Sequence, residues 1–244
     1  MRRELFAVAV LAGGLATRLR PLTQSIPKSM VDVAGKPFID HQLRLLRENG
    51  ASRVVICVGH LGEMIESHVG DGRDVGLTVS YSFDGDRLLG TAGAIKKALP
   101  MLGDSFFVLY GDSYLPCNYP QVQMEYARLD RPSLMTVYRN EGRWDSSNVE
   151  LVDGQILAYD KKHPNPRMHH IDYGLGVFHR SAFAPVPDQE SYDLATLYQE
   201  LLRTHRLAAF EVSQRFYEIG SLVGLEEMRA HVSGLTLSFE HGQR

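Results

Sequence analysis

Apolar runs and amphipathic segments alternate along the first half of the chain. Four runs rich in apolar and β-branched residues predict buried strands: 5–11, 53–59, 77–83 and 105–113. Helical spacing of apolar residues predicts three helices between them: 37–50, 61–70 and 91–102. We expect Gly50 to end the first helix and Pro100 to end the third. Strands that alternate with helices of this length imply right-handed crossovers, so we predict an α/β fold built on a mostly parallel sheet flanked by helices.

The second half has a different pattern. It contains three strand-like stretches followed by two helical ones: 133–140, 147–162, 171–180, 193–205 and 225–232. Asp153-Gly154 within the second stretch is a hairpin signal. Because no linker rich in Pro, Gly or Ser separates the halves, we predict a single domain over 1–244. Its first half, 1–115, would hold the parallel sheet, and its second half, 116–235, would add a substrate wall.

The first apolar run allows a second interpretation. Arg2 and Arg3, followed by apolar residues and a small-residue site near Gly14 or Ala16, are typical of a secretory leader. Cleavage there would delete the first strand of the predicted sheet, so we favour a strand at 5–11.

Composition narrows the possible compartment and partners. Two cysteines give no disulfide framework, and no apolar run reaches the roughly 18 residues that cross a bilayer. We therefore expect a cytoplasmic protein without a membrane partner. The net charge of -3, with no dominant basic stretch, argues against a nucleic acid polymer. The sequence leaves the oligomeric state open, a homo-oligomer included.

Ligands of open α/β sheets bind beyond the carboxyl ends of the strands. Three predicted loops lie there: 12–28, 59–62 and 111–116. In the first, Gly13 and Gly14 leave backbone N–H groups accessible to an anion. Arg18, Arg20 and Lys28 follow, and clustered cations beside open amides suit a triphosphate. The loop matches neither the Walker pattern nor the dinucleotide pattern G-x-G-x-x-G.

This loop belongs to a longer similarity. LAGGLATRLRPLTQSIPKSM resembles L-A-G-G-x-G-T-R-L-x-P-L-T followed by P-K-P-M, the signature of the sugar-1-phosphate nucleotidyltransferases. Six further segments resemble that family: AGKPFIDHQL, LLGTAGAIKKAL, LYGDS, AYDKK, IDYGLGVF and RFYEIGS. The resemblance spans residues 5–230 and implies a Rossmann-like, GT-A-type nucleotidyltransferase fold. It also implies the reaction of an NTP with a sugar 1-phosphate to give an NDP-sugar and pyrophosphate.

The resemblance assigns roles residue by residue. Arg18 would grip the β and γ phosphates, Lys28 would lie near the reacting phosphates, and Asp112 with Glu218 would hold Mg²⁺. Seven positions match the nucleotide-binding residues: Leu11, Ala12, Gly13, Gly14, Gly90, Thr91 and Gly93. Five match the sugar-phosphate site: Lys162, or Lys161 one residue earlier, with Asn148, Asp172 and Gly174. His163, His169 and His170 lie close together in sequence but lack the pattern of a zinc site, and we expect surface histidines.

The chain departs from the family pattern at four positions. Ala16 replaces a glycine, Ser29 a proline, Glu218 an aspartate and Asp172 an asparagine. These departures keep a second hypothesis open, a non-catalytic regulatory subunit that binds an NDP-sugar. A glycosyltransferase is a third, but it would have no use for the triphosphate loop.

Among short family members the chain resembles heptose or mannose 1-phosphate guanylyltransferases and N-acetylmuramate 1-phosphate uridylyltransferases. LGTAGAIKKAL and FFVLYGDSY favour GTP with a heptose-type sugar, and UTP with N-acetylmuramate or a hexose is the alternative.

Overall fold

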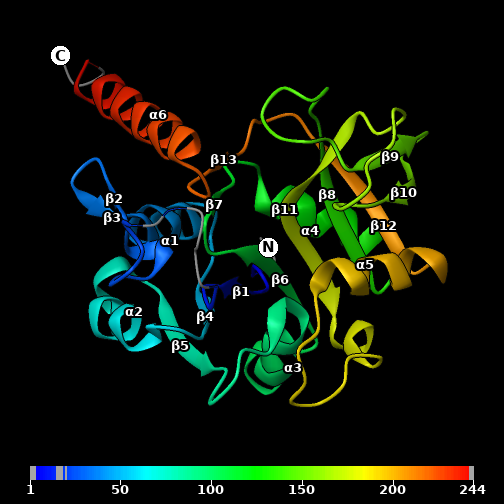
Figure 1. The fold of residues 1–244 in the computed structure, drawn as a ribbon, viewed down its shortest axis with the longest axis horizontal. Coiled ribbons are helices and arrows are strands. Elements are labelled where there is room, and N and C mark those ends of the chain that lie inside the picture. Colours follow the sequence, from blue (N-terminus) through cyan, green and yellow to red (C-terminus); the bar gives the residue numbers. More distant parts are fainter. Residues whose placement is uncertain (1–3, 15–18, 20, 242–244) are drawn as a thin grey trace.

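In the computed structural model, which describes residues 4–14, 19 and 21–241, a nine-stranded sheet lies between layers of helices (Figure 1). The four strands of the first half lie in the order β5-β4-β1-β6, and all three of their pairings are parallel, as predicted. Their bounds are β1 Ala7–Leu11, β4 Arg53–Val58, β5 Thr78–Phe83 and β6 Ser105–Tyr110. β1 lies between β4 and β6. Because helices also cover both faces of the sheet, β1 is buried on all sides, which explains its unbroken apolar sequence.

The helices of the first half cover this parallel region. They are α1 Phe38–Glu48, α2 Gly62–Val69 and α3 Gly90–Leu102. Ile39, Leu43 and Leu46 of α1 are buried together, as their spacing predicts. Pro100 does not end α3, so that expectation was wrong. The helix continues for two residues beyond Pro100 because Leu102 is fully buried in the core, and it ends at Gly103, which has φ of 83°.

In the second half the sheet becomes antiparallel around one long strand. β11, His170–His179, pairs antiparallel with β6 and with β8, Ser133–Arg139. β9, Val149–Val152, and β10, Gln155–Tyr159, form the predicted hairpin. Its turn residues Asp153 and Gly154 both have positive φ, as a two-residue hairpin turn requires.

Two of the longer elements were not predicted from the sequence. β12, Leu207–Val212, pairs parallel with β8 and is largely half-buried, but its sequence LAAFEV lacks the alternation of apolar and polar residues expected of such a strand. α4, Tyr119–Arg128, buries Tyr119, Val122 and Gln123 in an otherwise polar segment and begins with the cap residue Asn118.

Among the remaining elements, β13, Tyr217–Glu218, and α6, Leu222–His241, bring the end of the chain against its first half. The others are α5 Leu194–Arg203, the strand β7 Ser113–Tyr114, which pairs with β13, the paired strands β2 Asp32–Val33 and β3 Lys36–Pro37, and the short helices η2 Lys28–Met30, η3 Arg73–Val75 and η4 Arg180–Phe183. α6 exceeds the predicted 225–232 at both ends and lies against β2 and α1 (Figure 1). Among the described helices, none is both long and apolar enough to cross a membrane.

The depth of the core predicts a contrast between two leucines. Leu43 in α1 is 1% exposed, whereas Leu157 in β10 is 57% exposed. We expect Leu43→Ala to lower the free energy of unfolding by about 2–5 kcal/mol, because it removes buried apolar contacts and leaves a cavity. Leu157→Ala should change it by less than about 0.5 kcal/mol. Urea unfolding of both variants measures the difference, and equal losses would contradict this packing.

Candidate functional site

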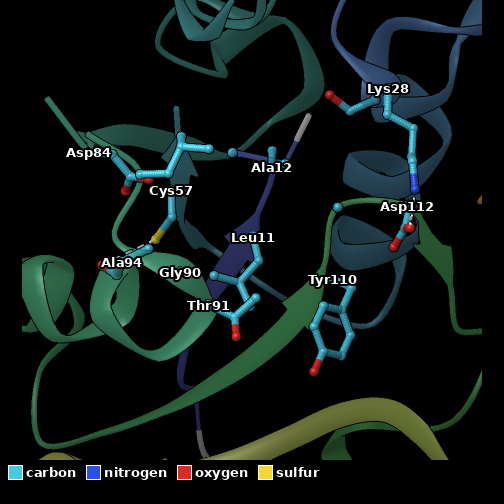
Figure 2. A pocket seen from close by; sticks show the side chains of 15 residues that line it. Leu11, Ala12, Lys28, Cys57, Asp84, Gly90, Thr91, Ala94, Tyr110 and Asp112 are labelled. Atoms are coloured by element: carbon cyan, nitrogen blue, oxygen red, sulfur yellow. Dashed lines mark hydrogen bonds and ion pairs between the residues drawn. The ribbon is translucent and has the colours of Figure 1, made fainter. Parts of the chain in front are cut away.

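A cavity of about 240 Å³ opens at the carboxyl ends of the parallel strands (Figure 2). Leu11, Cys57 and Tyr110 lie side by side at the ends of β1, β4 and β6, and all three line it. Among the described residues, the lining consists of Leu11, Ala12, Gly13, Gly14, Lys28, Ser29, Cys57, Asp84, Leu88, Gly90, Thr91, Ala94, Tyr110, Gly111 and Asp112. The loops predicted after β1 and β6 therefore contribute to one cavity, while the described loop 59–62 does not line it.

Two glycines have different surroundings at the end of β1. A Cβ on Gly13 would lie 3.0 Å from the backbone nitrogen of Gly59, so the close packing of two loops requires a glycine there. A Cβ on Gly14 would meet no atom of the described residues within 4 Å. Of these two glycines, Gly14 is therefore the one that packs against no neighbouring loop in the described part of the chain. Arg18, to which the resemblance assigns a role, and Ala16, which departs from the family pattern, lie outside the described residues.

Lys28 and Asp112 form the charged end of the cavity (Figure 2). Lys28 Nζ lies 2.7 Å from Asp112 Oδ2, and the two side chains are 18% and 25% exposed. Lys28 belongs to η2 and Asp112 follows β6, so two distant segments place opposite charges together.

Glu218 lies on the strand next to Asp112. Its strand β13 pairs with β7, where Glu218 is opposite Ser113, and the N–H of Ile219 donates to the Asp112 carbonyl at 2.9 Å. The Glu218 carboxylate lies against the first turn of α6, where its Oε1 would be 3.3 Å from a Cβ on Gly224.

The chemistry of these two carboxylates fits Mg²⁺. The described residues hold no cluster of three or more His, Cys, Asp or Glu side chains able to bind a metal. Mg²⁺ does not require such a cluster, because it commonly uses one or two carboxylates together with waters and substrate phosphates. Asp112 supplies a hard oxygen ligand inside the cavity, where a cationic ammonium already contacts it. The three clustered histidines form separate pairs, His163 with Asp160, His169 with Glu141 and His170 with Glu211.

The opposite end of the cavity holds Asp84, which we had not singled out in the sequence (Figure 2). Asp84 is the first residue after β5, and Asp112 is the second residue after β6. The position of Asp84 at the carboxyl end of a strand is therefore the sequence signal that indicates a ligand-binding residue. Its Oδ2 accepts from the N–H of Leu89 at 3.1 Å, and burial raises the pKa of this carboxyl above its usual value. Cys57 lies nearby, and burial raises the pKa of its thiol to about 12, which keeps it a thiol.

The glycine-rich start of α3 lies between the two ends. A Cβ on Gly90 would lie 2.7 Å from the Tyr192 carbonyl oxygen, and one on Gly93 would lie 2.6 Å from that of Glu190. Thr91 Oγ1 accepts from the N–H of Leu194 at 2.6 Å. Gly90 and Thr91 line the cavity and Gly93 does not, so part of this motif serves contact with the segment before α5.

The predicted sugar-phosphate residues form a cluster beyond Tyr110, which we call the Lys161 cluster: Lys161, Asp172, Asn148 and Gly174. Lys161 Nζ lies 3.0 Å from Asp172 Oδ2 and 3.5 Å from the Tyr110 hydroxyl, and 4.9 Å from the centroid of the Tyr110 ring. Burial alone would lower the pKa of Lys161, but the Asp172 carboxylate raises it overall. Lys161 therefore stays charged beside the cavity.

Asp172 is fixed from three sides. Asn148 Oδ1 accepts from its N–H at 2.9 Å, the Tyr159 hydroxyl donates to Oδ2, and the N–H of Gly174 donates to Oδ1 at 3.1 Å. Lys162 is exposed, and its backbone N–H donates to Asp160. The structure thus brings Lys161, and not Lys162, to Tyr110.

Comparison with known proteins accords with this geometry. Residues 7–143, more than half of the chain, match the nucleotidyl transferase family. A UTP–glucose-1-phosphate uridylyltransferase of Synechocystis sp. is 31% identical over 76% of this chain and 52% of that protein, so the chain spans about half the length of this relative. A D-glycero-alpha-D-manno-heptose 1-phosphate guanylyltransferase of Campylobacter jejuni is 26% identical over 86% of this chain and 93% of that protein.

A solved structure shares the fold. HddC from Yersinia pseudotuberculosis, complexed with GMP-PN, matches with a TM-score of 0.75 and 23% identity over 93% of this chain and 100% of that one. At this identity the likeness shows the Rossmann-like fold alone. The family match covers β1, α1 to α3 and β6, the elements that build the cavity. The chain belongs to the nucleotidyl transferase family and, within it, to the sugar-1-phosphate nucleotidyltransferases.

Proposed function

We propose that the chain transfers a nucleotidyl group from an NTP to a sugar 1-phosphate, giving an NDP-sugar and pyrophosphate. One observation carries this proposal: Tyr110 lines the cavity at the strand ends and also contacts Lys161. A cation for a second phosphate therefore stands next to the cavity that already holds Lys28 and Asp112. Two phosphate sites side by side are what this reaction requires.

The chemistry needs charge and position more than a base. A phosphate oxygen of the sugar phosphate is already ionised at neutral pH, attacks the α phosphorus, and the bond to the β phosphate breaks as pyrophosphate leaves. The obstacle is the approach of two polyanions, which fixed positive charge relieves. Lys28 and the backbone at Gly14 would hold the triphosphate, while Lys161 would hold the sugar phosphate. Mg²⁺ held by Asp112 and Glu218 would neutralise phosphate charge, and Arg18 is proposed to contact the leaving pyrophosphate.

Asp84 supports a preference for GTP. With phosphates at the Lys28 end, the base would lie at the Asp84 end of the cavity. Guanine presents two adjacent N–H donors, which suit a carboxylate, whereas the single ring N–H of uracil lies between two carbonyl oxygens that repel one. We therefore favour GTP, with a heptose- or mannose-type 1-phosphate, over UTP with N-acetylmuramate or a hexose 1-phosphate. We propose that the protein makes an activated sugar in the cytoplasm for the synthesis of cell-surface glycans.

Pyrophosphate release tests the reaction against the regulatory hypothesis. We expect release in Mg²⁺ buffer from one pair in a matrix of five NTPs and a panel of heptose, mannose, glucose and N-acetylmuramate 1-phosphates. Asp112→Asn should lower kcat by about 10²-fold or more, because it removes the ionised ligand from the phosphate site. Binding of an NDP-sugar without release from any pair would favour the regulatory subunit.

The two neighbouring lysines give a matched test of the sugar-phosphate site. We expect Lys161→Ala to raise the KM for the sugar 1-phosphate by about 10- to 100-fold, the range for losing a charge-assisted hydrogen bond, with little change in the KM for the NTP. Lys162→Ala should behave as the unaltered protein because that side chain is exposed away from Tyr110. Steady-state kinetics with each substrate varied measures both. The reverse result would assign the role to Lys162.

Base selection is tested at Asp84. Asp84→Asn keeps one acceptor oxygen for the N–H of Leu89 but replaces the other oxygen by an NH2 donor, which cannot pair with a guanine N–H. We expect the ratio of kcat/KM for GTP to that for UTP to fall by about 10- to 100-fold, as for loss of a bidentate base contact. Asp86→Asn, an exposed acid in the same loop, is the control and should leave the ratio unchanged. An unchanged ratio in both variants would remove Asp84 from base recognition.

A further inference from the structure

Gln42 of α1 holds the backbone on both sides of Asp112. Its side chain is 1% exposed, and its Nε2 donates to the Tyr110 carbonyl at 2.9 Å and to the Ser113 carbonyl at 2.8 Å. These carbonyls flank Gly111 and Asp112, so one amide group spans the whole turn that presents the carboxylate. Both N–H donors of the amide are used on this turn.

The same turn is constrained on its other side by β1. Gly111 donates its N–H to the Leu11 carbonyl at 2.9 Å, and a Cβ on Gly111 would lie 2.7 Å from that oxygen. The turn therefore lies between a close backbone contact with β1 and the Gln42 amide. Without the amide, the Tyr110 and Ser113 carbonyls would lose the donor group that they share, and the turn between them would lose its connection to α1.

The helix that carries Gln42 also holds the Lys28 segment. The N–H of Phe38, at the start of α1, donates to the Val31 carbonyl at 3.0 Å, and His41 Nε2 lies 2.8 Å from the Val33 carbonyl. Val31 directly follows η2, which contains Lys28. One face of α1 thus positions both members of the Lys28–Asp112 pair, each through contacts with backbone.

We propose that Gln42 is a positioning residue of the phosphate site. By fixing residues 110–113 relative to α1, it aligns Asp112 with Lys28 at one side and holds Tyr110 against Lys161 at the other. Gln42 acts on the reaction through these residues and does not line the cavity. The proposal rests on the proposed function for its kinetic consequence, whereas its effect on phosphate binding can be measured without turnover.

The chain provides a matched control in Gln123. This residue of α4 is 6% exposed, and its Nε2 donates to the Glu4 carbonyl at 2.9 Å while its Oε1 accepts from the N–H of Phe6 at 2.7 Å. Gln42 and Gln123 are therefore both buried helical glutamines that make two hydrogen bonds to backbone. Gln123 serves the segment before β1, at the opposite edge of the sheet from the cavity.

The experiment compares Gln42→Met with Gln123→Met, which remove the same hydrogen-bonding group and keep similar volume. We expect both to lower Tm by several degrees, about 2–4 °C for each kcal/mol lost in a domain of this size. Only Gln42→Met should lower kcat, by about 10- to 100-fold, the order expected when reacting groups are displaced by an ångström. It should also weaken the binding of pyrophosphate in Mg²⁺ buffer, measured by calorimetry, by about 10-fold, since aligned charge holds this anion.

Equal losses of kcat in the two variants, or unchanged kcat and pyrophosphate affinity in Gln42→Met, would overturn the proposal. If the unaltered protein binds pyrophosphate but turns over no substrate pair, the proposed function fails and the calorimetric comparison alone decides for or against Gln42. Absence of pyrophosphate binding by the unaltered protein would also overturn it, because no phosphate site would exist to be positioned. Should Gln42→Met fail to fold, Gln42→Asn withdraws the amide by one methylene, and Gln123→Asn is its control.

Discussion

The parallel pairing of β5, β4, β1 and β6 constrains every other feature of the site. Because parallel strands all end at the same edge of the sheet, the loops after them meet in one place. Gly13 after β1, Asp84 after β5 and Asp112 after β6 are far apart in sequence yet line one cavity. The direction of the strands therefore brings the residues of the proposed phosphate site together, and the individual side chains then determine its charge.

The second constraint is the placement of charge at that edge. A carboxylate at each end of the cavity, Asp84 and Asp112, would repel a polyanion unless cations compensate it. Lys28 does so within the cavity and Lys161 does so just beyond Tyr110, where Asp172 in turn pairs with it. Both pairs are largely buried, so the cost of removing the charges from water offsets much of their attraction, and their geometry must come from the surrounding backbone. α1 supplies much of that geometry, since it contacts both the Lys28 segment and the turn at Asp112.

How far the sequence predicts this molecule depends on where burial is complete. β1 was predicted from its unbroken apolar run, and α1 from the helical spacing of its buried apolar residues. β12 and α4 were not predicted, because the apolar residues of β12 follow no alternation and those of α4 are interspersed with polar residues. Pro100 shows that tertiary packing of Leu102 can override a local helix-ending signal. Asp84 was not predicted as a site residue, although it follows a strand at the edge of the sheet where ligands bind. The choice between Lys161 and Lys162 depends on a one-residue register, which the spacing of residues in the sequence does not determine.

The most direct measurement of the central claim follows the label from a radioactive nucleotide. The unaltered protein would be incubated in Mg²⁺ buffer with a sugar 1-phosphate and GTP, or UTP in parallel, labelled with ³²P at either the α or the γ position. The account predicts that the α label appears in the nucleotide sugar and the γ label in pyrophosphate, in equal amounts. Label in inorganic phosphate or nucleoside diphosphate, or α label that never reaches a sugar from any substrate pair, would contradict nucleotidyl transfer by this site.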